Sequence, residues 1–89
     1  MDINYSAIHF DHFVEFTKDD CIFGAGREKT NNRTRLFLIV NHTGCVYSRN
    51  GRTDAWEVVG QNEETLIREQ AATAKQSGLY FTTNTHFTN

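Results

Sequence analysis

Five consecutive apolar residues at 36–40, Leu-Phe-Leu-Ile-Val, constrain the fold more than any other part of the sequence. A strand that is apolar on both faces is typical of the middle of a sheet, where neither face is left to solvent. Downstream, the pair Asn50-Gly51 favours a two-residue hairpin turn, because both positions of that turn need a positive φ. We therefore expect a meander of three strands, at about 34–41, 45–49 and 53–59.

The N-terminal part of the chain is also predicted to form strands. Even positions of segment 8–16 are apolar except for His12, and odd positions are mostly polar, which is the period of a half-buried strand. An amphipathic helix over the same residues is the alternative, and the phenylalanine and valine content favours the strand. A second strand is expected at 21–25. The polar segment 24–33, which contains two glycines, is expected to be a mobile loop. It either becomes ordered on a partner or is a solvent-exposed connection without a functional role.

Residues 62–77 are predicted to form the single helix. Asn62 suits the N-cap position, glutamates follow it at the positive end of the helix dipole, and Gly78 can end the helix in a left-handed conformation. A last strand is expected at 79–81, followed by a polar tail at 82–89 that frays. The helix has a narrow apolar stripe whose small residues allow close approach to a sheet: Leu66, Ile67, Ala71 and Ala74.

Together these elements predict an α+β fold, with a largely antiparallel sheet of five or six strands and the helix at about 62–77 packed on one face. The chain has 89 residues, and we expect 1–89 to be a single domain. The side chains expected in its core are Phe10, Val14, Phe16, Leu36, Leu38, Val40, Trp56, Val58, Leu66 and Ile67.

Charge is segregated along the chain, although the net charge is only −2. Residues 27–52 hold six basic side chains against one acidic one, whereas 1–26 and 53–89 are both net negative. Such a block either pairs with acidic parts of the folded surface or presents a polarised surface to a partner. The candidate binding residues are therefore Arg27, Lys29, Arg33, Arg35, Arg49 and Arg52.

Metal binding has weak support in the sequence. His9, Asp11 and His12 cannot converge on a metal from one strand, because His12 points away from the other two. A hairpin turn can bring His42 and Cys45 onto one zinc ion, with a further ligand from elsewhere; a buried thiol and a solvated imidazole are the alternative. We expect no metal and no cofactor.

No local motif for catalysis is present. Segment 24–30 contains glycines, a lysine and a threonine, but it lacks the spacing of a phosphate-binding loop and the helix that must follow one. A small ribonuclease assembled from a histidine, a glutamate and the arginines stays an alternative. The net negative charge argues against an enzyme that must bind a polyanion. We expect a protein without enzymatic activity.

The sequence therefore favours a small protein-binding module that acts by surface complementarity. Inhibitors of host machinery encoded by phages or mobile elements, including anti-CRISPR proteins, are often of this size and acidity. The alternative is a nucleic-acid-binding domain that uses the basic meander 27–52, since some DNA-binding domains lay a small sheet into the major groove. If the chain presents a DNA-like face to its protein partner instead, the contacts would be acidic: Asp11, Glu15, Asp19 and Asp20.

The expected location is the cytoplasm. The N-terminal segment has neither the basic start nor the apolar core of a signal peptide, and no apolar run approaches the ~18 residues of a membrane span. Cys21 and Cys45 do not form a C-x-x-C pair and are expected to be reduced thiols. We expect no contact with a membrane.

Overall fold

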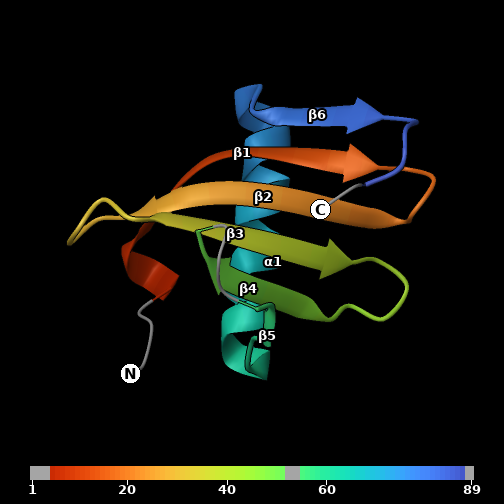
Figure 1. Cartoon of the computed structure of the whole chain (residues 1–89). Coiled ribbons are helices and arrows are strands. Elements are labelled where there is room, and N and C mark those ends of the chain that lie inside the picture. The colour runs from red at the N-terminus through yellow and green to blue at the C-terminus, as the bar shows by residue number, and fades with distance from the viewer. Residues whose placement is uncertain (1–4, 52–54, 88–89) are drawn as a thin grey trace.

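The computed structural model describes residues 5–51 and 55–87. These residues form a mostly antiparallel six-stranded sheet and one α-helix, so the predicted α+β fold is confirmed (Figure 1). The strands lie side by side in the order β5-β4-β3-β2-β1-β6. The elements are η1 Tyr5–Ala7, β1 Ile8–Phe16, β2 Cys21–Glu28, β3 Thr34–Val40, β4 Val46–Asn50, β5 Glu57–Val58, α1 Gln61–Ser77 and β6 Tyr80–Thr83.

The topology covers one face of the sheet and leaves the other open. Strands β1 to β5 pair with their neighbours in antiparallel fashion, and β3 lies inside the sheet as its apolar residues predicted. Helix α1 then runs across the strands behind the sheet, and β6 pairs in parallel with β1 at the other edge (Figure 1). We call the face that α1 covers the inner face and the opposite one the outer face.

The core lies between α1 and the inner face. Phe13, Phe37 and Ile67 are fully buried there. The ring of Phe10 packs on both phenylalanines, with ring centroids 5.6 Å from Phe13 and 5.1 Å from Phe37. The other members of the buried cluster are Ile8, Ile22, Ile39, Val46, Val59, Ala71 and Ala74.

The predicted core was largely wrong, because it took the wrong face of two strands. In β1 a bulge between Phe10 and His12 shifts the register against β2, so that Phe13 follows Phe10 on the inner face. In β3 both faces are apolar, and α1 covers Phe37 and Ile39. Of the predicted core residues, Ile67 is buried and Phe10 packs partly buried against the core. The others are only partly buried or exposed: Val14, Phe16, Leu36, Leu38, Val40, Trp56, Val58 and Leu66.

Strand β2 is longer than predicted and the following loop is shorter. The strand continues to Glu28, so the prediction of a mobile loop over 24–33 was wrong for its first half. The glycines that suggested a loop mark close packing instead. A Cβ atom at Gly24 would lie 2.6 Å from the ring of Phe13, and one at Gly26 would lie 2.7 Å from a backbone oxygen of β1.

The ends of α1 agree with the prediction only at the C-terminus. Gly60 rather than Asn62 occupies the N-cap and supplies no side-chain cap, whereas Gly78 ends the helix with a φ of 78°. Strand β5 is shorter than the predicted 53–59, of which 53 and 54 lie outside the described residues. No helix within 5–51 and 55–87 combines the length and the apolarity needed to cross a membrane.

The turn predicted at Asn50-Gly51 differs as well. Asn50 ends β4 by pairing with Arg35, and within the described residues of this turn only Gly51 has a positive φ, of 65°. The backbone N–H of Gly51 donates to the carbonyl of Thr34 at 3.0 Å. Asn50 and Gly51 therefore extend the β3–β4 pairing by one backbone hydrogen bond beyond Arg35.

The C-terminal segment is ordered further than the frayed tail predicted at 82–89. Its first two residues belong to β6. The ring of Phe87 packs on the outer face, with centroids 5.2 Å from Phe16 and 5.5 Å from Phe23. The backbone N–H of Phe87 also donates to the carboxylate of Asp19. These contacts tie the segment to the β1–β2 turn.

Candidate functional site

An unbroken row of apolar side chains crosses all six strands on the outer face. Side chains alternate along a strand, so the neighbours of the buried Phe13 and Phe37 point outward. The strand register places these neighbours next to one another from β6 to β5. We call them the apolar row: Phe81, Val14, Phe23, Leu38, Tyr47 and Val58.

The apolar row is open to solvent along most of its length. Val58 is 72 % and Phe81 53 % exposed, and the four central members are partly exposed. Within the described residues the C-terminal segment packs on this face at Phe16 and Phe23, whereas α1 lies on the other side (Figure 1). The outer face of an antiparallel sheet normally carries polar side chains. An apolar stripe of this kind is typical of an interaction surface.

Basic side chains border the apolar row where β1 begins. The guanidinium of Arg27 donates to the carboxylate of Asp11 at 3.1 Å, and Nε2 of His9 lies 3.6 Å from the same oxygen. The guanidinium of Arg49 lies 4.9 Å from the ring centroid of Trp56. This cation–π contact places a partly exposed cationic side chain beside the row.

Acidic side chains border the other end, at the β1–β2 turn. The backbone N–H of Phe87 and the ring of His86 hydrogen-bond to Asp19, and they hold the pKa of that carboxyl below its usual value. Asp20 lies 3.7 Å from Nδ1 of His42. The outer face is therefore polarised along the strands, with arginines at one end and aspartates at the other.

The six basic candidates from the sequence do not form one surface. Arg35 lies on the inner face and is only 8 % exposed. Its Nη1 donates to Oγ of Ser48 at 3.1 Å, and its Nε lies 3.6 Å from the carboxylate of Glu28. Arg35 therefore supports the fold. The others are divided between the outer face (Arg27, Arg49), the exposed turn after β2 (Lys29, Arg33) and a position outside the described residues (Arg52).

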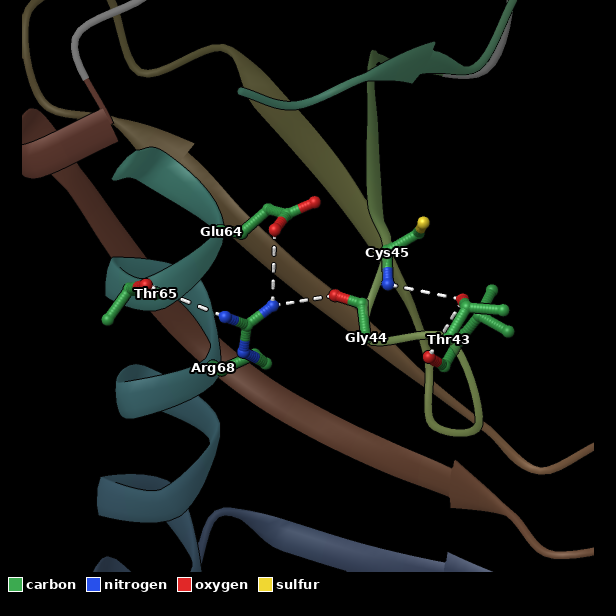
Figure 2. A network of polar contacts seen from close by, with 7 residues as sticks. Thr43, Gly44, Cys45, Glu64, Thr65 and Arg68 are labelled. Atoms are coloured by element: carbon green, nitrogen blue, oxygen red, sulfur yellow. Dashed lines mark hydrogen bonds and ion pairs between the residues drawn. The ribbon is translucent and has the colours of Figure 1, made fainter. Parts of the chain in front are cut away.

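A second arginine network fixes α1 to the turn between β3 and β4 (Figure 2). Nη1 of Arg68 donates to the carbonyl of Gly44 at 2.6 Å and lies 3.4 Å from the carboxylate of Glu64. In the turn, Oγ1 of Thr43 accepts a hydrogen bond from the N–H of Cys45 at 3.2 Å. Gly44 has a φ of 77°, a left-handed turn conformation that glycine adopts readily. The network holds the helix on the inner face and so keeps the outer face open.

The described residues offer little to metal binding or catalysis. No group of three or more histidine, cysteine, aspartate or glutamate side chains among them is arranged to hold a metal ion. In this part of the chain the ion pairs of His9, His42 and His86 are each with an aspartate. Burial raises the pKa of Cys21, and two nearby aspartates add to the effect, so this thiol is a poor nucleophile.

Sequence reasoning missed the apolar row, although the signal for it was present. Leu36, Leu38 and Val40 alternate with Phe37 and Ile39, so β3 had two apolar faces and the single predicted helix could cover only one. The face that the helix leaves open should have been taken as an interaction surface. Comparisons of the chain with protein-family models, with curated proteins and with solved structures found no match.

Proposed function

We propose that this chain is a small non-enzymatic protein-binding module and that the apolar row is the centre of its contact surface. The observation that supports the proposal is the row itself, which runs over six strands on the face without a helix. Protein interfaces combine an apolar centre with a polar rim, and aromatic and arginine side chains are enriched in them. Tyr47 and Phe81 within the row and the stacked Arg49 beside it fit this composition.

The charges around the row indicate the chemistry of the partner. We propose a protein with a flat apolar patch that is bordered by carboxylates on the side facing Arg27 and Arg49. Arg27 is paired with Asp11 at 3.1 Å, and Arg49 lies over the ring of Trp56; both are candidate anchors for these carboxylates. Trp and Arg dominate the binding energy of many interfaces.

We further propose that the module acts in the cytoplasm as an inhibitor of host machinery, of the kind that phages and mobile elements encode and that includes anti-CRISPR proteins. The support for this setting is the small size and the segregated charge. Both cysteines are free thiols, which suits a reducing compartment.

Site-specific photo-crosslinking tests the proposed surface. A photoreactive phenylalanine analogue replaces Tyr47 in the apolar row or, as the control, Glu69 on the exposed side of α1. In cells of the native host, we expect a discrete adduct with another protein from position 47 and none from position 69. The variant Leu38→Lys should remove the adduct while the circular dichroism spectrum stays unchanged, because Leu38 lies outside the core.

Three results would contradict the proposal. Equal adducts from positions 47 and 69 would mean that capture does not depend on the outer face. An adduct that survives Leu38→Lys would exclude the apolar row. Adducts formed only between two copies of this chain would assign the face to self-association.

Single-stranded nucleic acid is the second candidate partner, and one observation favours it. Tyr47 and Phe23 lie on an open sheet face with Arg49 stacked on Trp56 nearby, and several RNA-binding sheets stack bases on such aromatic rings. The burial of Arg35 leaves fewer cations for phosphates than the sequence suggested. Fluorescence anisotropy with an oligonucleotide of about 12 residues tests this alternative.

The anisotropy experiment has a clear outcome in either direction. Binding at about 50 mM salt that is lost in both Tyr47→Ala and Arg49→Ala would favour nucleic acid over a protein partner. No change in anisotropy at about 100 µM protein would dismiss it, because even non-specific binding is usually tighter than that.

A further inference from the structure

The edge of β1 is open along its N-terminal half. Strand β6 pairs with β1 only from Phe13 to Phe16, and the first bond on that side runs from the N–H of Phe13 to the carbonyl of Leu79, at 2.9 Å. Segment 8–12 therefore has β2 on one side and, within the described residues, no strand on the other (Figure 1). An open edge of this kind can take up an additional strand.

The backbone groups at this edge have a defined orientation. The carbonyl of Ala7 accepts from the N–H of Lys29 at 2.9 Å, so it points toward β2. Because backbone groups alternate along a strand, the N–H and C=O of Ile8 and Phe10 point toward the open edge. The bulge after Phe10 ends this regular stretch. The edge therefore offers two residues with paired donors and acceptors.

A cavity of about 350 Å³ lies along the same edge, within the size range of ligand sites. Ile8, Phe10 and Ala74 give it apolar walls, and the C-terminal half of α1 closes its other side with Thr73 and Ser77. A side chain of an added strand that points to the inner face would enter this cavity. The cavity is large enough to admit a side chain, and its lining also includes polar residues such as Asp11 and Gln70.

The two ends of the groove differ in charge. Lys29 lies at one end, where it lines a second cavity of about 340 Å³ together with His9 and Arg27. Glu28 and Asp11 are the acidic groups facing this end; the first is paired with Arg35 and the second with Arg27. At the other end the last turn of α1 presents carbonyl oxygens, which carry the negative end of the helix dipole.

We propose that this groove binds an extended acidic peptide that runs antiparallel to β1. In this direction the C-terminal end of the peptide reaches Lys29, where its carboxylate meets a positive charge, and its N-terminal end lies at the end of α1. The backbone of the peptide pairs with Ile8 and Phe10, and one of its side chains enters the cavity. The site lies at the open edge of β1 and not on the outer face that carries the apolar row, and it does not depend on the function proposed for that row.

A synthetic peptide of defined polarity tests the proposal. The probe is acetyl-Arg-Thr-Val-Thr-Val-Asp-Glu with a free carboxyl terminus, and its control is the same composition in reverse order with an amidated end. With isotope-labelled protein, the probe should shift the amide resonances of Ile8 and Phe10 and slow their hydrogen exchange, because these N–H groups become bonded. The reversed peptide should bind at least tenfold more weakly.

Variants separate strand pairing from simple charge attraction. Lys29→Glu should weaken binding of the probe about tenfold, since it removes a charge-assisted contact with the carboxylate of the peptide. The matched control Lys18→Glu changes another exposed lysine, in the β1–β2 turn after the far end of β1, and should leave affinity unchanged. Thr73→Trp should abolish binding by filling the cavity from an exposed helix position. N-methylation of the probe at the residues that pair should abolish binding, and methylation of the alternate residues should not.

Each opposite result overturns the proposal. No shift at Ile8 and Phe10 with about 1 mM probe would mean that the edge does not bind a strand. Equal affinity for the two peptide directions would exclude the proposed polarity. Insensitivity to both patterns of N-methylation would show that the backbone of the peptide does not pair with β1. None of these results bears on the apolar row, which the crosslinking experiment tests separately.

Discussion

Replacing Gly24 with alanine tests the packing that sets the two faces of the sheet. Gly24 lies opposite Phe13 in the β1–β2 ladder, and an added Cβ atom would lie 2.6 and 2.7 Å from two atoms of the Phe13 ring. The ring cannot easily move away, because Phe13 is fully buried and its centroid stacks 5.6 Å from that of Phe10. The substitution therefore forces a displacement inside the core.

The expected cost follows from two opposing effects. Overpacking a well-packed core usually costs about 1–3 kcal/mol. Replacing glycine with alanine also restricts the unfolded chain, which offsets roughly 0.4–1 kcal/mol of that cost. We expect Gly24→Ala to lower the free energy of unfolding by about 1–2 kcal/mol. For a domain of this size each kcal/mol corresponds to a fall in Tm of roughly 4–8 °C.

Urea denaturation, followed by fluorescence of Trp56, measures this change. Gly60→Ser is the control, because the nearest atom to its Cβ is a flexible carboxylate oxygen at 3.5 Å and serine is a good N-cap residue. In the double variant with Phe13→Leu, the smaller side chain should relieve the clash and give a coupling energy of about 1 kcal/mol. A loss below about 0.5 kcal/mol for Gly24→Ala, with no coupling, would refute the packing of Phe13 over Gly24.

Three further predictions test the buried and terminal contacts. Arg35→Ala should lower the free energy of unfolding, measured with denaturant, by roughly 3 kcal/mol, because it breaks a buried ion pair. The control Arg33→Ala, at an exposed position, should change it by no more than about 0.5 kcal/mol. Equal effects of the two variants would place Arg35 at the surface. Arg68→Met should cost about 1–2 kcal/mol through its bond to the β3–β4 turn, and an unchanged midpoint would contradict that anchor. The pKa of Asp19 is lowered in the folded state, so its hydrogen bond to the N–H of Phe87 stabilises the protein at pH values above the ordinary pKa of 3.8 and is lost as the pH falls through the lowered pKa. The amide resonance of Phe87 should follow this titration, and Asp19→Asn should remove the pH dependence.

The order and type of the elements could be predicted from local signals. The apolar run of β3 placed that strand inside the sheet, and Gly78 gave the end of α1 correctly. The pairing of β2 with β3 and of β3 with β4 needed only short connections, which turn residues mark in the sequence. Local signals failed where a residue acts through a distant partner. Gly24 suggested a loop, whereas it lies in β2 because the ring of Phe13 packs against it.

The choice between the two faces of the sheet could not be made from periodicity, because alternation is the same whichever face is covered. One extra residue at the bulge of β1 moves every later side chain of that strand to the opposite face, so Phe13 enters the core and Val14 joins the apolar row. The better signal is complementary size across neighbouring strands. Gly24 and Gly26 leave space for the aromatic rings of β1 on one face of β2. The rings must therefore lie on this face, which is the inner face. Once the rings are assigned there, the remaining apolar side chains of β1 to β4 lie on the face opposite α1, where within the described residues Phe87 packs only on Phe16 and Phe23. The open remainder of this face is what the sequence and the strand register together indicate as an interaction surface.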